Sequence, residues 1–377
     1  MRTRAGKYIY VAERLSRRIK AGDYHLQKLP AERDLAAEVG VSHATARKAI
    51  QKLLDEGLLI RLANGRLAVR RNDEGEDGPI KTQIALLVPA WESREVTRWH
   101  VAISQLAARF KVAVRTVYYA HLDDPLVFST LDRFDGTFFL PIPDDIPPHF
   151  MAKFLSAPRP VVVLSNNWTE HGVPSVRLHP PVAVQKLLDH LLAQGHQRID
   201  CFNVQPVGSA LQALMSQWNL WRAARGLDGV MINEPVSPFE ETLQVAYNVI
   251  AKRIRDGKFD TTAMLCTTER DAAGAMRAIA DAGMQVGKDV AVCTIDGSGR
   301  AEYAIPSLTS LEAPDPAPYI AVCLEWMLAG KDRQWKGPML VEPDKIELAV
   351  RQSTVPDIDS QVPPQRVRMS QTEPTPV

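Results

Sequence analysis

Apolar residues near the start of the chain recur at helical spacing. Between residues 8 and 19 they occupy one helix face, at the i, i+3, i+4 positions Tyr8, Val11, Ala12, Leu15 and Ile19. Gly22 follows and predicts the end of this helix, because glycine is common just past a helix C-terminus. The chain is therefore expected to begin with a helix that buries one face.

Two further helices are predicted from their start and stop signals. The stretch LPAERDLAAEVG begins near Pro30, which suits a first helical turn, and ends at Gly40, which suits the position after a helix. The hydroxyl of Ser42 can accept a hydrogen bond from a first-turn N–H, so we expect a helix from His43 to Glu56. Two helices joined by so short a turn predict a helix-turn-helix.

The second of these helices has an apolar face and a polar face. The apolar face is formed by Ala46, Ala49, Ile50, Leu53 and Leu54. The opposite face carries His43, Ala44, Arg47, Lys48 and Gln51. On a recognition helix such a face meets DNA: Arg47 can pair with guanine or with a phosphate, and Lys48 can neutralise a phosphate. The alternative is a solvated amphipathic helix, but the tight turn and the cap favour DNA binding.

A basic hairpin is predicted directly after this helix. In LLIRLANGRLAVRR two apolar runs flank Asn64-Gly65, and this dipeptide is a strong signal for a two-residue hairpin turn. A hairpin beside a helix-turn-helix is typical of a winged helix. Asn64 and Arg66 at its tip are therefore candidate DNA contacts.

The distribution of charge supports this interpretation. Residues 1–72 hold 16 Lys and Arg against 7 Asp and Glu, whereas the remaining residues hold 29 against 37. The net charge of +1 thus hides a basic head on an acidic body. We expect only the head to approach a polyanion.

Residues 83–350 alternate short apolar runs with amphipathic runs. The apolar runs are 83–89, 112–119, 136–141, 159–165, 175–178, 198–203, 229–232, 262–266 and 289–296. Helical patterns separate most of them, for example over residues 182–195. This alternation predicts an α/β fold with parallel sheets flanked by helices, and the number of units predicts two lobes.

Ligands of such sheets bind beyond the carboxyl ends of the strands. The candidate residues there are Trp91, Glu92, Trp168, Glu269 and Asp296. Aromatic rings and carboxylates suit a polyhydroxylated ligand, because rings stack on its apolar face and carboxylates accept hydrogen bonds from its hydroxyls. For all of them except Asp296 a role as an ordinary loop residue or in lobe closure stays equally open.

Other sequence features limit the possible function. The chain lacks a signal peptide and an apolar run of membrane-spanning length, so we expect a cytoplasmic protein. The four widely spaced cysteines are expected to be buried free thiols, and no close Cys/His pairing predicts a metal site. Neither a Walker loop nor GxSxG nor HExxH occurs, so we expect no catalytic residues and no cofactor.

The head resembles the GntR-type winged helix-turn-helix. The similarity rests on LPAERDLA (29–36), on residues 41–59 and on the wing at Gly65. It implies DNA contacts from Arg33, Ser42, His43, Thr45 and Arg47. His43 departs from the family, which usually has an arginine there, and the wing lacks the second glycine of the usual tip.

The body resembles the effector domain of LacI-type regulators. The similar segments are VQKLLDHLLAQGHQRIDCFN (184–203) and residues 263–331, and they imply a two-lobed, periplasmic-binding-protein-like fold. A GntR-like head on a LacI-like body is the arrangement of the arabinose repressor and its relatives. Asp296 keeps a sugar-binding aspartate, whereas family positions have changed to His179, Leu214, Thr268 and Glu269, which implies a non-standard ligand or none.

The sequence thus predicts a head (1–72), a linker (73–82), a body (83–351) and a disordered tail (352–377). We expect a homodimeric transcription repressor that binds double-stranded DNA at a pseudo-palindromic operator. A small molecule, such as a sugar, would bind between the lobes and change operator affinity. One alternative is a body that only dimerises; a fusion to an aminotransferase-like enzyme does not fit the length or rhythm of the body.

Overall fold

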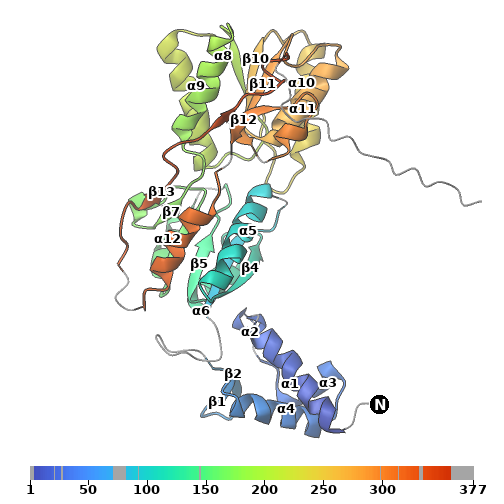
Figure 1. Ribbon diagram of the computed structural model, residues 1–377, viewed down its shortest axis with the longest axis vertical. Coiled ribbons are helices and arrows are strands. Elements are labelled where there is room, and N and C mark those ends of the chain that lie inside the picture. Colours follow the sequence, from blue (N-terminus) through green and yellow to red (C-terminus); the bar gives the residue numbers. More distant parts are fainter. Residues whose placement is uncertain are drawn as a thin grey trace, which may run out of the picture.

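The structure is a computed structural model that describes residues 4–20, 22–26, 29–70, 82–91, 93–143, 146–297, 299–312, 314–330 and 334–357. Figure 1 shows three tiers: a small helical head, a first lobe next to it and a second lobe at the far end. Most of the predicted linker and the residues after Asp357 lie outside the described residues.

The head contains four helices and a hairpin. They are α1 (Arg4–Lys20), α2 (Asp23–Leu26), α3 (Glu32–Val39), α4 (His43–Asp55), β1 (Leu59–Arg61) and β2 (Leu67–Val69). The predicted apolar stripes of α1 and α4 meet in one core, where Leu15, Ile19, Ile50 and Leu53 are each at most 2% exposed. Gly40 ends α3 in the left-handed region at φ +68°, and α4 begins three residues later. The helix-turn-helix and the wing are therefore present as predicted, and the short helix α2 was not foreseen.

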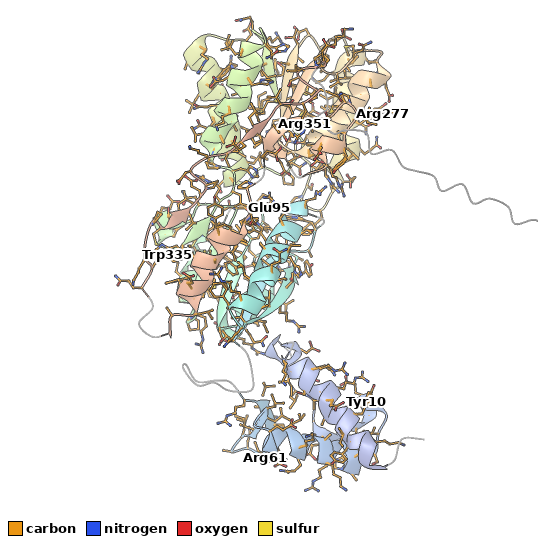
Figure 2. All side chains as sticks on the ribbon, viewed as in Figure 1. Tyr10, Arg61, Glu95, Arg277, Trp335 and Arg351 are labelled. Carbon is orange, nitrogen blue, oxygen red and sulfur yellow. The ribbon has the colours of Figure 1, made fainter. Side chains whose placement is uncertain are left out.

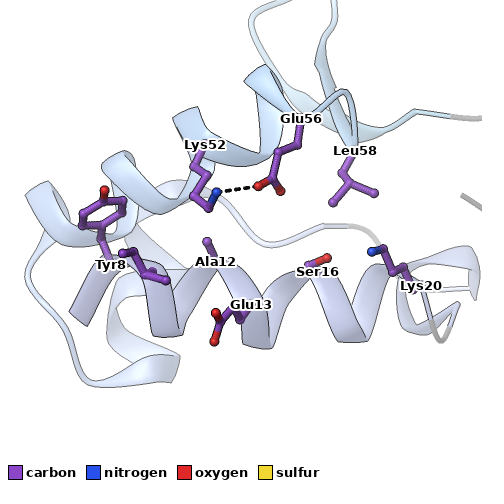
Figure 3. A pocket seen from close by; sticks show the side chains of 9 residues that line it. Tyr8, Ala12, Glu13, Ser16, Lys20, Lys52, Glu56 and Leu58 are labelled. Atoms are coloured by element: carbon purple, nitrogen blue, oxygen red, sulfur yellow. Dashed lines mark hydrogen bonds and ion pairs between the residues drawn. The ribbon is translucent and has the colours of Figure 1, made fainter. Parts of the chain in front are cut away.

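A groove of about 460 Å³ lies between α1 and the C-terminal part of α4 (Figure 3). Lys52 lines it and donates to Glu56 at 2.5 Å, across one turn of α4. Lys52 thus points along the α1 side of the helix. The exposed face of α4 is a different one.

The first lobe is a six-stranded parallel sheet in the order β13-β7-β6-β5-β3-β4. Its strands are β3 (Gln83–Pro89), β4 (Ala113–Tyr119), β5 (Gly136–Phe139), β6 (Val161–Leu164), β7 (Ser175–Val176) and β13 (Leu340–Val341). One face packs on α5 (Arg94–Arg109) and α12 (Ala317–Met327), the other on α6 (Pro125–Arg133) and α7 (Pro148–Leu155). The strand β3 is buried at all seven residues because both faces are covered, so its sequence is continuously apolar after Gln83.

The second lobe is a six-stranded sheet in the order β14-β12-β11-β10-β8-β9, parallel except for β14. Its strands are β8 (Ile199–Asn203), β9 (Met231–Asn233), β10 (Ala263–Cys266), β11 (Ala291–Gly297), β12 (Thr309–Glu312) and β14 (Leu348–Ala349). The helices α8 (Val184–Ala193) and α9 (Ser209–Arg225) cover one face, and α10 (Thr242–Arg255) and α11 (Glu269–Asp281) cover the other. In the described part of the body, short 3-10 helices occur at Thr169–His171, Pro181–Ala183 and Ala301–Tyr303.

The two-lobed α/β fold agrees with the prediction, but the C-terminal part of the chain does not follow the simple alternation. After β12 the chain returns to the first lobe as α12 and β13, then crosses again to β14 in the second lobe. The sequence also placed the disordered tail too early. Ser353 and Thr354 are buried against β11 and β12, where Ser353 Oγ donates to Val292 O at 2.6 Å.

The four cysteines are buried free thiols, as predicted: Cys201, Cys266, Cys293 and Cys323. Burial raises the pKa of each thiol, to about 12 for Cys323. None of the helices in the described ranges is both long and apolar enough to cross a membrane.

Candidate functional site

The start of α4 is held by a side-chain cap. Ser42 Oγ accepts a hydrogen bond from the Thr45 backbone N–H at 3.3 Å and lies 2.8 Å from Thr45 Oγ1. This satisfies one of the first-turn N–H groups and fixes where the helix begins. Two of the residues predicted to contact DNA thus have a structural role in presenting the helix.

The face of α4 away from the core is open to solvent. His43, Ala44, Arg47, Lys48 and Gln51 are all exposed, while Ala46, Ala49, Ile50 and Leu53 are buried. Gln51 donates to Asp55 at 2.9 Å within the same helix. In Figure 1 this helix lies farther from the first lobe than α2 does, so the body leaves the polar face accessible.

The head carries exposed cations on this face of α4, on α3 and in the wing. Within the described residues no hydrogen bond or ion pair engages Arg33, Arg47, Lys48 or Arg66, and all four are exposed. Arg61, labelled in Figure 2, differs because it pairs with Glu32 at 3.2 Å and donates to Gly65 O at 3.1 Å. A cation without a partner can bind a phosphate without first breaking an ion pair.

The wing is a tight turn that presents Arg66. Asn64 Oδ1 accepts a hydrogen bond from the Arg66 N–H at 3.1 Å, and Gly65 has φ +76°. Leu62 N–H donates to Arg66 O at 2.8 Å across the hairpin. The side chain of Asn64 therefore shapes the turn, and the guanidinium of Arg66 projects from it.

A second group of polar residues lies where the two lobes meet. Ser165 Oγ donates to Glu95 Oε1, and Trp99 Nε1 donates to Ser165 Oγ at 3.1 Å. Figure 2 shows Glu95 at the end of α5 that faces the second lobe. Ser165 directly follows β6 and has φ +63°, a conformation that costs energy for a residue other than glycine and is often found at functional sites.

The charge of Asp296 acts on both Glu95 and His179 across this junction. The protein packed around the Glu95 carboxyl raises its pKa, the hydrogen bond from Ser165 opposes this, and the charge of Asp296 adds to the increase, while the residue as a whole is exposed. This combination fits a carboxylate at the junction of the two lobes. Burial lowers the pKa of His179, and its Nε2 is buried with no hydrogen-bond partner in the described parts of the chain. A neutral imidazole thus holds a buried ring nitrogen at the lobe junction with an unused donor or acceptor.

Side chains of the two lobes contact each other at this junction. The rings of Trp91 and Phe239 meet edge to face with centroids 5.3 Å apart. Ser209 Oγ donates to Asn166 Oδ1 at 3.0 Å. A Cβ on Gly208 would lie 2.8 Å from Pro143 Cα, so only glycine permits this close approach. These contacts would change if the lobes moved.

The structure assigns different places to the predicted effector residues. Asp296 at the end of β11 and Trp91 after β3 lie at the lobe junction, as expected. Trp168 does not: it is 4% exposed and packs edge to face on Phe139 and Phe154 in the core of the first lobe. Its large apolar ring is buried because the short segment after β6 folds back over α7. We therefore remove Trp168 from the candidate site.

Glu269 and Glu92 stay untested, and Glu95 was missed. Glu269 begins α11 at the carboxyl end of β10, and Glu92 lies outside the described residues. Glu95 follows the Ser93 cap of α5, whose Oγ accepts from Val96 N–H at 3.4 Å. An acidic residue in the first turn of a helix that follows a strand end was the available signal.

Two family models match this chain, one over the head and one over the body. Residues 7–69 match the model of the bacterial regulatory proteins of the gntR family. Residues 188–354 match the model of a periplasmic binding protein-like domain. The chain carries a GntR-family head and a periplasmic-binding-protein-like body. The match to the second model begins in α8 and so includes most of the second lobe and the returning segment.

Individual relatives share part of the sequence and most of the fold. The lactose operon repressor of Escherichia coli (strain K12) is 29% identical over 130 residues, which is 33% of this chain and 33% of that protein. The lac repressor dimer bound to operator and the anti-inducer ONPF superimposes with a TM-score of 0.60 at 19% identity, covering 73% of this chain and 94% of that one. A LacI family regulator from Arthrobacter sp. FB24 in complex with lactose gives 0.59 at 20% identity, covering 73% and 99%. The solved structures confirm the two-lobed fold of the body, while the curated repressor is matched over a third of its length.

Proposed function

We propose that this protein is a cytoplasmic transcription regulator, a repressor rather than an enzyme, whose GntR-family head binds an operator and whose body senses a small molecule. The observation that carries the proposal is the exposed face of α4, capped at its start and surrounded by four uncommitted cations, on a head joined to a body with polar groups in an interlobe cleft. The first part can read DNA, and the second can bind a ligand.

The exposed side chains of the head support a set of proposed DNA contacts. Arg47 is placed to form a bidentate pair with guanine in the major groove, with His43, Ala44 and Gln51 along the same face. Arg33, Lys48 and Arg66 are placed for phosphates, and Ser42, Thr45 and Asn64 position the elements that carry them. His43 lies 3.9 Å from Glu32, which reduces its value as a phosphate contact.

The regulator is proposed to bind as a homodimer. The lac repressor structure with a similar body is a dimer bound to operator. A two-fold dimer presents two copies of α4, so the operator is expected to be pseudo-palindromic.

The effector is proposed to be a small molecule with several hydroxyl groups, such as a sugar. Glu95 from the first lobe and Asp296 from the second lobe are hydrogen-bond acceptors, and His179 adds one unused ring nitrogen. The Arthrobacter regulator was solved with lactose. A ligand bonded to both carboxylates would favour closed lobes, because it joins groups from opposite sides of the cleft.

The test is a selection of genomic fragments by the full-length protein, followed by mobility shifts of the selected duplex at about 150 mM salt, where phosphate contacts alone give weak binding. We expect a preferred duplex, and Arg47→Ala should reduce the preference over random DNA by about 1–3 kcal/mol because a base contact is lost. Lys48→Ala should instead weaken both duplexes alike. Equal binding of selected and random DNA by the wild type would overturn the proposal.

A body that only dimerises is the second candidate. Thermal unfolding in the presence of lactose and a panel of other mono- and disaccharides distinguishes this candidate from a ligand sensor. A ligand that binds only the folded body raises its melting temperature by mass action.

A further inference from the structure

Among the residues that the structure describes, polar contacts join the head to the first lobe. Arg115 Nη1 in β4 pairs with Asp23 Oδ1 in α2 at 2.8 Å. Gln83 Nε2, from the first residue of β3, donates to Lys20 O at 3.2 Å. In Figure 1 the α2 end of the head lies nearest the first lobe. The head is thus docked on the sheet of the first lobe by two strands.

The ion pair at Arg115 continues into the head. Asp23 Oδ2 also accepts from Arg18 Nε at 3.1 Å, and Arg18 Nη1 pairs with Glu38 Oε1 at 2.5 Å. Glu38 lies on α3, the helix that precedes the turn to α4. The Arg18 guanidinium also lies 4.9 Å from the centre of the buried Tyr24 ring. Four charged side chains therefore form a continuous chain from the first lobe to the helix-turn-helix, which we name the Arg115–Glu38 relay.

The aspartate of the relay, Asp23, is charged at neutral pH. Burial by itself would raise the pKa of Asp23, but the hydrogen bonds from Arg115 and Arg18 outweigh it, and the pKa lies below its ordinary value. Asp23 is thus ionised whenever the protein is in neutral solution.

The contact from Gln83 adds a fixed point of a different kind. Lys20 is the last residue of α1, and its carbonyl has no partner within the helix. Gln83 is 1% exposed, so its amide is held in one place by the lobe. The Gln83 amide thus holds the carbonyl of Lys20 at one point, and the ion pair at Asp23 holds the head at a second point. Two points of contact fix both the position and the orientation of the head.

The same two strands lead to the cleft. Gln83 and Arg115 lie near the N-terminal ends of β3 and β4, since Ala85 pairs with Arg115 in the parallel register. The other end of β3 is followed by Trp91 and by the turn of α5 that carries Glu95. A seven-residue strand spans roughly 23 Å. The strand that touches the head at one end therefore borders the cleft at the other.

We propose that the Arg115–Glu38 relay and the Gln83–Lys20 contact make the head and the first lobe one rigid unit, so that Arg115 and Gln83 are positioning residues for operator binding. The inference rests on the proposed function. A covalent connection alone limits how far a head can move but leaves its orientation free. With the contacts in place, a rotation of the first lobe against the second changes the spacing and angle of the two α4 helices in a dimer.

The strength of the contacts is sufficient for this role. The Arg115 and Asp23 side chains are 31% and 32% exposed, so the pair by itself contributes little to folding. The orientation of the heads, however, changes operator affinity in another way. Once the first head has bound its half-site, orientation sets the effective concentration of the second head at the other half-site. A change of several fold in this effective concentration is comparable to the factor by which an effector ordinarily changes operator affinity.

The test compares two duplexes selected by the wild-type protein: one with both half-sites and one with a single half-site. Arg115→Ala should lower affinity for the two-half-site duplex by about three- to tenfold and leave affinity for the single half-site unchanged. Asp23→Ala removes this pair together with the bond from Arg18, so it should lower affinity for the two-half-site duplex at least as much. The double variant should lose no more than Asp23→Ala alone, because Asp23→Ala already removes the pair with Arg115. The matched control is Arg277→Ala, which removes an exposed 2.9 Å pair with Asp281 in the second lobe, far from the head in Figure 2.

A measurement without DNA tests the docking itself. Spin labels on Glu13→Cys in α1 and Gln105→Cys in α5, both exposed positions, report the head–lobe distance, and the native cysteines are buried and do not compete. The wild type should give one narrow distance distribution, and Arg115→Ala a broader one, with the labelled protein diluted in unlabelled protein. Equal loss on both duplexes, or an unchanged distribution in Arg115→Ala, would overturn the relay. A wild type that prefers no duplex would instead overturn the proposed function, and the distance measurement would still decide the docking.

Discussion

At the scale of single residues, the structure separates side chains that are free to bind DNA from those that shape the binding surface. Arg47 and Lys48 extend from α4 without partners among the described residues, whereas Ser42 and Thr45 are hydrogen-bonded at its start. The sequence grouped all of them as contacts, because a residue type and its position do not show whether the side chain is already engaged. We expect their substitution to act in different ways: loss of base preference for Arg47, and loss of helix stability for Ser42.

Asp271 is a residue whose environment makes stability depend on pH. It is fully buried in α11, and it accepts from Thr267 Oγ1 at 2.7 Å and from Gln205 Nε2 at 2.8 Å. Burial raises its pKa to about 6, because these bonds only partly replace hydration. The raised pKa means that the folded state binds the proton more tightly. The contribution of Asp271 to the free energy of unfolding is complete below the pKa of about 4 that it has in the unfolded chain. This contribution is lost as the pH rises through about 6.

Asp271→Asn should remove this dependence. In urea unfolding, the wild type should lose about 1 kcal/mol from this group between pH 5 and pH 7, and the variant should not. Asp281→Asn is the control: it lies on the same helix but is exposed, and the hydrogen bond from Arg277 lowers the pKa of Asp281, so its titration falls below this window. An unchanged pH profile in Asp271→Asn would show that this carboxyl is ionised at pH 5.

At the scale of elements, the long periodic segments were predictable and the short crossing segments were not. The helical pattern over residues 182–195 located α8 (Val184–Ala193) to within two residues, because this helix buries one apolar face. The strands β13 and β14 have two residues each, which is too short for any periodic pattern. The turn at 352–354 carries polar residues whose burial depends wholly on β11 and β12. Its composition therefore resembled that of the tail.

Ser353 should contribute measurably to the stability of the second lobe. Its Oγ accepts from Thr309 N–H at 2.8 Å and donates to Val292 O, and the residue is 0% exposed. Ser353→Ala leaves two backbone groups without this partner, so the free energy of unfolding should fall by about 1–3 kcal/mol. Deleting residues 358–377 is the comparison and should leave the urea midpoint unchanged. A wild-type midpoint in Ser353→Ala would mean that water replaces the hydroxyl.

At the scale of the whole molecule, the proposed effector site combines residues far apart in the chain. Glu95 and Asp296 come from different lobes, and His179 lies on a segment that crosses between them. The sequence identified Asp296 by its place after a strand, but it selected Trp168 for the same reason, and Trp168 is in the core. Which side chain at a strand end points to the cleft depends on how the lobes and loops pack.

Asp296→Asn and Glu95→Gln should each separate sensing from DNA binding. With a sugar that raises the wild-type melting temperature, each variant should bind at least about tenfold more weakly, because a charged hydrogen-bond acceptor is lost. Affinity for the selected operator without the sugar should stay the same. Glu302→Gln, an exposed carboxylate shortly after β11, is the control. Wild-type sugar binding in both variants would mean that the ligand lies elsewhere.

The sequence by itself determined the helix-turn-helix, its cap, the wing and the alternating strands and helices of the body. These follow from local propensity, periodicity and turn chemistry, which act over a few residues. Only the tertiary structure decided which strand-end residues meet in the cleft, that the chain returns to the first lobe through α12, and that Arg115 and Gln83 hold the head. Those features join residues tens to hundreds of positions apart, and their geometry depends on packing that no local pattern records.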